Sequence, residues 1–173
     1  MKKLAAGGIV AHACEGVWGL ACDPFRLDTV SRLLALKGRR FDKGLIVIAS
    51  SAADFAPEFT QLDENVAEAV RASWPGPETW VVPNVRFANI ITGNRATVAI
   101  RVPGHAQARA LARKYGGPLV STSANRAGHP PARTELRVRR RMGARVDYVL
   151  PGAVGDNSGP TRVRIASSGE RLR

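Results

Sequence analysis

The stretch from Leu33 to Ser50 constrains the fold of this chain most, because it predicts a helix end, a short loop and a buried strand in direct succession. Apolar residues recur at helical spacing from Leu27 to Leu34, and Asp28 is the expected N-cap of this helix. Gly38 should end the helix, and the apolar run 45–49 is typical of a strand covered on both faces. A helix that leads into such a strand indicates an α/β arrangement.

The loop between this helix and this strand carries four cations within seven residues. They are Lys37, Arg39, Arg40 and Lys43. Because regular structure anchors the loop at both ends, it can present fixed positive charge to a polyanion. A solvated basic turn is the alternative interpretation of the same residues.

Strands and helices alternate along the rest of the chain, and they predict an α/β (α+β) fold with an open, twisted, mixed β-sheet flanked by helices. We expect a Gly-punctuated turn from Cys14 to Leu20 and a polar connecting stretch around Asp54. No shift in composition marks a boundary, so residues 1–173 are expected to form a single domain. The expected strands cover residues 8–13, 45–49, 79–82, 97–102, 119–120, 148–150 and 161–165, and further helices cover residues 63–73, 105–115 and 134–142.

Positive charge narrows the class of partner. The chain has 26 Lys+Arg against 14 Asp+Glu, a net charge of +12 and a pI near 11.1, which favours nucleic acid or phosphorylated ligands. Aromatic residues make up only 6% of the chain, which disfavours a stacking platform for single-stranded nucleic acid. No apolar run is long enough to span a bilayer, and two cysteines suit a reduced setting, so we expect a cytoplasmic protein without a membrane partner.

Several standard chemistries have no motif in this sequence. It contains no P-loop, no G-x-G-x-x-G after a strand and no G-x-S-x-G nucleophile elbow. His12, Cys14 and Cys22 could be imagined as metal ligands, but their spacing fits no standard zinc pattern. We therefore predict no metal site built from protein side chains.

Two polar features accompany the strands. The segment Ser121–Asn125 places three hydroxyls and an amide directly after an apolar strand, where open α/β sheets bind ligands. A turn with capping side chains would use the same residue types. Arg101 interrupts an apolar strand, so it should either reach the strand edge and water or pair with a carboxylate or phosphate.

Five short motifs follow one another in a familiar order. The motifs are Cys14-Glu15-Gly16-Val17-Trp18-Gly19-Leu20, similar to P-T-E-x-x-[YF]-G-L; Lys37-Gly38-Arg39 with Lys43-Gly44-Leu45, similar to K-x-R-x-x-x-K-x-L; Trp74-Pro75-Gly76-Pro77 with Thr79, similar to W-P-G-P-x-T; Ala99-Ile100-Arg101-Val102-Pro103, similar to A-[IV]-R-x-P; and Ser121-Thr122-Ser123-Ala124-Asn125, similar to S-T-S-A-N. Together they resemble the YrdC-like threonylcarbamoyl-AMP synthase family, known in bacteria as TsaC.

This resemblance implies a YrdC-like fold with a concave basic surface. It also implies a nucleotidyltransferase that condenses L-threonine, bicarbonate and ATP into threonylcarbamoyl-adenylate and pyrophosphate, with Mg²⁺ assisting. The product would pass to the tRNA threonylcarbamoyl-transferase complex, for threonylcarbamoyladenosine formation beside the anticodon of tRNA.

The resemblance also implies roles for individual residues. Lys37, Arg39 and Lys43 would form the catalytic set, with Lys37 neutralising phosphate charge. The implied ATP-binding residues are Arg39, Lys43, Thr97, Ser123, Arg133 and Arg173, and the implied threonine-binding residues are Cys14, Arg101, Ser121 and Thr161.

The chain departs from the family pattern at several positions. Cys14 replaces a Thr, Ala13 a Pro, Arg40 a frequent Pro, and Ile48 a His of longer relatives. A non-catalytic paralogue that binds double-stranded RNA, tRNA or rRNA through the same basic surface is therefore the alternative function. Its phosphate contacts would come from the arginines of the basic helix region, which are Arg133, Arg137, Arg139, Arg140, Arg141 and Arg145.

Overall fold

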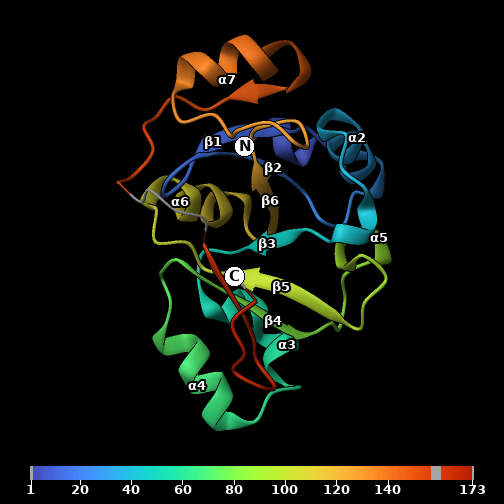
Figure 1. Ribbon diagram of the computed structural model, residues 1–173, viewed down its shortest axis with the longest axis vertical. Helices are drawn as coiled ribbons and strands as arrows, with labels where there is room; N and C mark the ends of the chain where they lie inside the picture. The colour runs from blue at the N-terminus through green and yellow to red at the C-terminus, as the bar shows by residue number, and fades with distance from the viewer. Residues whose placement is uncertain (1, 157–160, 173) are drawn as a thin grey trace.

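The computed structural model describes residues 2–156 and 161–172 and contains one mixed β-sheet (Figure 1). The order of its eight strands is β7-β1-β2-β6-β3-β5-β4-β8. The mixed sheet expected from the sequence is thus confirmed. The strands are β1 (Val10–Ala13), β2 (Trp18–Cys22), β3 (Ile46–Ile48), β4 (Glu78–Pro83), β5 (Thr97–Arg101), β6 (Leu119–Ser123), β7 (Tyr148–Val149) and β8 (Arg162–Ile165).

The sheet contains both parallel and antiparallel pairs of strands. Strand β6 is antiparallel to both of its neighbours, β2 and β3, while β3 is parallel to β5. The N-terminal ends of β2, β3 and β5 therefore meet the C-terminal end of β6 at one edge of the sheet. The loops at this edge carry most of the residues that the motifs single out.

Helices connect the strands and cover the sheet. The helices are α1 (Lys2–Ala5), α2 (Leu27–Lys37), α3 (Ala56–Phe59), α4 (Glu64–Ala72), α5 (Asn89–Thr92), α6 (Ala106–Tyr115) and α7 (Glu135–Met142), and the 3₁₀ turns are η1 (Phe41–Lys43), η2 (Ala52–Phe55) and η3 (Gly143–Arg145). The four-residue helices α1, α3 and α5 and the 3₁₀ turns were not expected from the sequence. Of these, η2 and α3 occupy the polar connecting stretch around Asp54.

Helix α2 ends as expected but begins differently. Gly38 adopts a left-handed conformation with φ of 59°, and its N–H donates to the carbonyls of Leu34 and Ala35. The prediction that Asp28 caps the helix is wrong, because Arg26 is the N-cap and makes no side-chain capping bond. Asp28 lies instead in the first turn, where a carboxylate stabilises the positive end of the helix dipole.

Strand β2 is the main departure from the sequence expectation. We expected a turn as far as Leu20, but the turn ends at Val17 and Trp18 begins a fully buried strand. Because β2 lies between β1 and β6 and is covered on both faces, its residues show no apolar and polar alternation. Similarly, β6 continues through Ser123, so the serines that we expected after a strand belong to it.

Apolar side chains fill both faces of the sheet. On one face, Trp18, Leu20, Val47 and Ile100 belong to a large cluster that also contains the buried residues of α2. On the other face, a smaller cluster joins the sheet to α6. Both faces are covered, as expected for a layered α/β protein.

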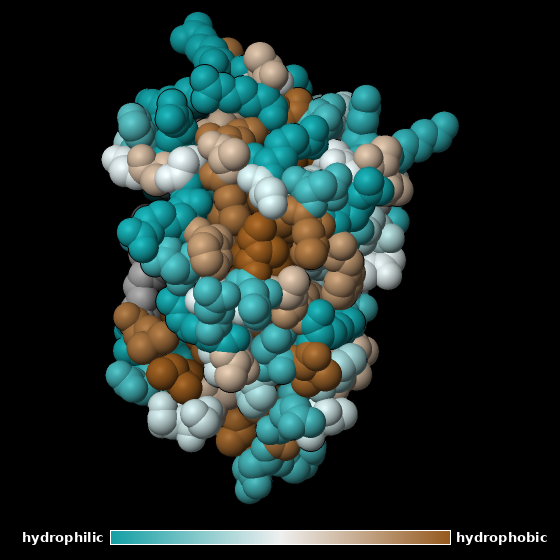
Figure 2. Space-filling view, turned by 90° about the vertical axis from the view of Figure 1, so that its right-hand side faces the viewer, coloured by the Kyte–Doolittle hydropathy of each residue, from teal (hydrophilic) through white to brown (hydrophobic). Residues whose placement is uncertain are grey.

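The surface beside α2 and α5 has an apolar centre. Figure 2 shows apolar side chains gathered in the middle of this face, with hydrophilic side chains above and below. Leu27 of α2 and Phe41 of η1 are among the exposed large apolar residues of the chain. No helix within residues 2–156 and 161–172 is both long and apolar enough to cross a membrane.

Candidate functional site

Lys37 joins the end of α2 to the end of β6. Its side chain is buried, with 3% exposure, and its ammonium donates to the carbonyl oxygens of Ser123 and Asn125, the latter at 2.8 Å. The Asn125 side-chain oxygen lies at 3.5 Å from the same nitrogen. Burial, together with the nearby charge of Arg39, lowers the pKa of Lys37 to about 8. Lys37 thus supplies positive charge beneath the Ser123–Asn125 segment, while the protein itself occupies its donors.

The basic loop after α2 is held by its own backbone. The Arg39 guanidinium donates to the carbonyl oxygens of Gly44, at 3.0 Å, and Lys43, at 3.4 Å. Gly44 has a φ of 62°, a conformation that strongly favours glycine. Lys43 itself is exposed. The loop therefore has a fixed shape with positive charge at its surface.

Thr97 and Ser123 lie at the same edge of the sheet as this loop. Ile46 of β3 is paired with Ala99 of β5 and with Ser121 of β6. Gly44 lies two residues before Ile46, Thr97 two residues before Ala99, and Ser123 two residues after Ser121. Thr97 and Ser123 are therefore both level with Gly44. The structure thus brings together five of the predicted residues, namely Lys37, Arg39, Lys43, Thr97 and Ser123.

Arg133 borders this region, whereas Thr161 lies at the opposite end of β4 and β5, near Arg101. Arg133 is exposed and follows Ala132, whose carbonyl accepts from the Trp18 N–H at 2.8 Å, at the start of β2. Thr161 precedes β8 and lies beside the turn at Pro77, because Arg162 N–H donates to the Pro77 carbonyl at 3.1 Å. Arg173 lies outside the described residues.

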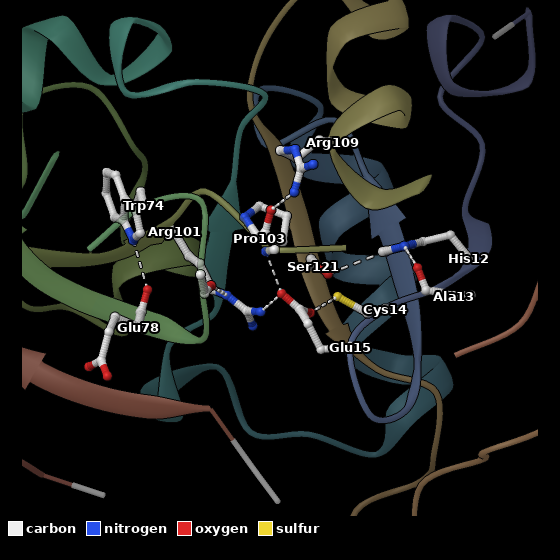
Figure 3. Close-up of polar contacts among 12 residues, drawn as sticks. His12, Ala13, Cys14, Glu15, Trp74, Glu78, Arg101, Pro103, Arg109 and Ser121 are labelled. Carbon is white, nitrogen blue, oxygen red and sulfur yellow. Dashed lines mark hydrogen bonds and ion pairs between the residues drawn. The ribbon is translucent and has the colours of Figure 1, made fainter. Parts of the chain in front are cut away.

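A second polar cluster surrounds Arg101. This side chain is buried and donates from Nε to the Gly76 carbonyl at 3.0 Å (Figure 3). Its Nη2 forms an ion pair with Glu15, whose side chain is also largely buried. The same carboxylate accepts from the Cys14 thiol at 2.7 Å and from the Gly104 N–H at 2.7 Å. Arg101 therefore pairs with an anion, as expected, but the anion in this structure is Glu15.

The Glu15–Arg101 ion pair joins two segments that belong to distant strands of the sheet. Glu15 follows β1 and Arg101 ends β5, and three strands separate β1 from β5 in the sheet. In a flat sheet these strands would lie about 19 Å apart, far beyond the reach of an arginine side chain. The contact thus brings the β1–β2 loop and the end of β5 together.

The electrostatics of this cluster are set by burial and by charge. Burial alone would raise the pKa of Glu15, but the Arg101 guanidinium and the hydrogen bond from Cys14 hold it below its usual value. Burial, followed by the negative charge of Glu15, raises the pKa of Cys14 to about 12. The cluster at neutral pH therefore contains a carboxylate, a guanidinium and a neutral thiol.

Ser121 faces a buried histidine that the sequence analysis did not assign to the site. The Ser121 hydroxyl lies 3.4 Å from Nε2 of His12, and Nδ1 of His12 lies 3.0 Å from the Ala13 carbonyl (Figure 3). Burial lowers the pKa of His12 to about 4, so the ring is neutral. Nδ1 therefore donates to Ala13, and Nε2 accepts from Ser121. Among the described residues, no three His, Cys, Asp or Glu side chains gather as metal ligands.

Glu15 and Asn125 also belong to the site, although neither was predicted as a site residue. Both lie inside the quoted motifs, so the motifs carried the signal although no role was given to them. A separate hollow of about 340 Å³ contains none of the predicted ATP-binding or threonine-binding residues. It is lined by Arg32, Ala35, Leu36, Arg126 and Arg145.

The site combines a cationic sheet edge that carries hydroxyl groups with a buried ion pair that joins the β1–β2 loop to the other end of β5. Phosphate groups suit the first arrangement and a charged small molecule the second. The fold and the site thus define an α/β protein with a cationic site suited to anionic ligands.

Comparison with known proteins identifies the family. A family model described as "Telomere recombination", Sua5/YciO/YrdC, matches residues 2–171. A threonylcarbamoyl-AMP synthase from Halorhodospira halophila is 47% identical over 172 residues, which cover 99% of this chain and 90% of that protein. A protein of the same name from Nitrosococcus oceani is 43% identical over 173 residues, with coverage of 99% and 94%. This chain belongs to the Sua5/YciO/YrdC family, and the resemblance seen in its motifs is confirmed.

A solved structure supports the same fold. The structure of P. abyssi Sua5 complexed with L-threonine matches with a TM-score of 0.91 and 26% sequence identity. The match covers 98% of this chain but 50% of the Sua5 chain, so this chain spans about half of that protein.

Proposed function

We propose that this chain is a nucleotidyltransferase that condenses L-threonine, bicarbonate and ATP into threonylcarbamoyl-adenylate, with release of pyrophosphate. Full-length relatives that are 43–47% identical carry the name of this synthase. The observation that carries the proposal in the structure is the arrangement of two polar clusters, around Lys37 and around Arg101, on one sheet.

The cationic edge would bind ATP. A carbamate oxygen must attack the α-phosphate, so the reaction brings anions together and depends mainly on positioning and charge neutralisation. Arg39, Lys43 and Arg133 would contact phosphate or ribose oxygens, with the hydroxyls of Thr97 and Ser123 as further partners. Mg²⁺ would arrive with the ATP phosphates, because this ion usually keeps waters and phosphate oxygens as its ligands. Lys37 would act through its charge.

The buried cluster would bind the amino acid. The Arg101 guanidinium can hold a carboxylate through two hydrogen bonds. Cys14, Ser121 and Thr161 surround the rest of this pocket in the proposal. Support comes from the P. abyssi Sua5 structure, which is a complex with L-threonine.

The product would serve tRNA modification in the cytoplasm, through the tRNA threonylcarbamoyl-transferase complex. Both cysteines are free thiols, which agrees with a reduced compartment. The exposed arginines of α7 suit RNA phosphates. If the chain bound RNA but lacked the synthase activity, it would be the non-catalytic paralogue considered as the alternative.

The test is an assay of pyrophosphate release by the purified chain with Mg²⁺. We expect release that requires ATP, threonine and bicarbonate together. In Arg39→Gln, release should fall about 100-fold, the size typical for loss of one donor that stabilises charge in a transition state. Arg40→Gln is the matched control, because Arg40 is exposed and pairs with Asp42. Pyrophosphate release that ignores threonine, or none at all from folded protein, would contradict the proposal.

A further inference from the structure

Glu15 has no role in the proposed reaction, although it lies at the centre of the Arg101 cluster. Its side chain is 12% exposed and that of Arg101 is 6% exposed. Taking two such charges out of water is unfavourable, and their mutual attraction only partly offsets it. A buried ion pair in a substrate pocket is therefore a candidate for a binding function.

We propose that Glu15 binds the ammonium group of the substrate amino acid. The proposal rests on the proposed function, in which Arg101 holds the carboxylate of threonine. The amino acid would enter the ion pair as a zwitterion, with its carboxylate on Arg101 and its ammonium on Glu15. The pair thus acts as a receptor for molecules that carry both charges on neighbouring carbons.

The hydrogen bonds of Glu15 leave room for this ligand. One carboxylate oxygen accepts from the Gly104 N–H and the other from the Cys14 thiol, both at 2.7 Å. An ionised carboxylate offers about four lone-pair sites. Oε1 accepts from Arg101 as well as from Gly104, so a further N–H can bind at Oε2, and at Oε1 once Arg101 has turned away. These two contacts fix the carboxylate in place after Arg101 turns toward the substrate.

Arg101 keeps donors for the carboxylate in the same way. Two of its contacts go to the Gly76 carbonyl and to Glu15, and a guanidinium has five N–H donors. Arg101 therefore has N–H donors left for the carboxylate of the ligand. The charges of Arg101 and Glu15 also lie side by side, as the carboxylate and the ammonium of an amino acid do.

Electrostatics make a second charged partner necessary. A pocket with Arg101 alone would bury the ammonium of threonine without an anion, which is costly in a site shielded from water. The Cys14 thiol is neutral, since its pKa is raised to about 12, and cannot serve as that anion. Glu15 is the carboxylate that contacts both Arg101 and Cys14.

The test compares threonine with 3-hydroxybutyrate, which keeps the hydroxyl and the carboxylate but lacks the ammonium group. Affinities are measured by calorimetry with a non-hydrolysable ATP analogue present. We expect the wild type to bind threonine at least tenfold more tightly than 3-hydroxybutyrate. In Glu15→Gln, threonine should bind at least tenfold more weakly, while 3-hydroxybutyrate binds equally well or better, because Glu15 no longer competes for Arg101.

Glu58→Gln is the matched control. Glu58 is a buried carboxylate that pairs with Arg86 away from the site, so this variant should keep the wild-type ratio of the two affinities. A general loss of stability would weaken both ligands and leave their ratio unchanged.

Three outcomes would overturn the proposal. One is an unchanged affinity ratio in Glu15→Gln. Another is equal binding of threonine and 3-hydroxybutyrate by the wild type, which decides the matter even if the variant does not fold. The third is a wild type that binds neither ligand and releases no pyrophosphate with threonine, and in that case the proposed function fails as well. If pyrophosphate release depends on threonine but the affinity ratio is unchanged in Glu15→Gln, only the role of Glu15 is rejected.

Discussion

At the scale of single residues, Lys37 shows how burial and charge act together. Its ammonium is enclosed by carbonyl oxygens of β6 and the residues that follow, and its pKa is lowered to about 8 by burial and by Arg39. The charge beneath the proposed ATP site is therefore present at neutral pH and is lost in mildly alkaline solution. An arginine at the same position would keep it.

This gives a prediction for the pH profile. We expect kcat/KM for ATP to fall above about pH 8, as Lys37 deprotonates, and this fall to be absent in Lys37→Arg. The contribution of Lys37 to the free energy of unfolding changes with pH in the opposite direction. Because folding lowers the pKa, the native state holds the proton less tightly than the unfolded state, so the Lys37 contribution to stability rises from about pH 8 toward the ordinary value of 10.5. If kcat/KM for ATP falls equally above pH 8 in the wild type and in Lys37→Arg, the assignment of this fall to Lys37 is wrong.

The sequence predicted some of these residues but not their contacts. The motifs placed Lys37, Arg39 and Ser123 in one site, which agrees with the structure. Neither composition nor spacing could show that Arg101 pairs with Glu15, or that Ser121 meets His12, because 86 and 109 positions separate these partners along the chain.

At the scale of elements, three neighbouring strands position Ser121. His12 of β1 is paired with Gly19 of β2, and a Cβ added to Gly19 would lie 2.9 Å from His12 Nε2 and 3.4 Å from the Ser121 hydroxyl. Gly19 therefore leaves the space through which the two side chains meet. Strand β2 itself escaped sequence prediction, since a buried central strand with a glycine resembles a turn.

We predict that Gly19→Ala disturbs the contact between His12 and Ser121. Overpacking should lower the free energy of unfolding by about 1–3 kcal/mol and raise KM for threonine more than KM for ATP. Gly117→Ala is the control, because an added Cβ meets nothing within 4 Å, and it should change stability by no more than about 0.5 kcal/mol. Denaturant unfolding and steady-state kinetics check both effects. Equal stability of the two variants would show that Gly19 is not required for packing.

At the scale of the whole molecule, net charge and fold point to the same kind of partner. The chain carries a charge of +12, and α7 with η3 adds exposed arginines to a molecule whose proposed ATP site would also bind phosphates. The mixed sheet could be predicted from the sequence because its strands alternate with helices. The strand order could not, since it depends on pairings between distant segments.

We predict that α7 contributes to RNA binding and not to catalysis. The double variant Arg137→Glu with Arg140→Glu should weaken tRNA binding at least tenfold at low salt and flatten its salt dependence, while pyrophosphate release stays unchanged. Arg113→Glu with Lys114→Glu makes the same charge change on exposed positions of α6 and serves as the control. Equal effects of the two double variants would mean that only net charge matters.

The structure of the chain with ATP, Mg²⁺ and threonine tests the central claim most directly. That claim is that separate strands and loops bind one nucleotide at the cationic edge of the sheet and hold one amino acid on Arg101. We predict nucleotide density beside Arg39, Thr97 and Ser123, with the threonine carboxylate on Arg101. Nucleotide bound instead in the hollow between Arg32 and Arg145, with Arg101 still paired to Glu15, would contradict it.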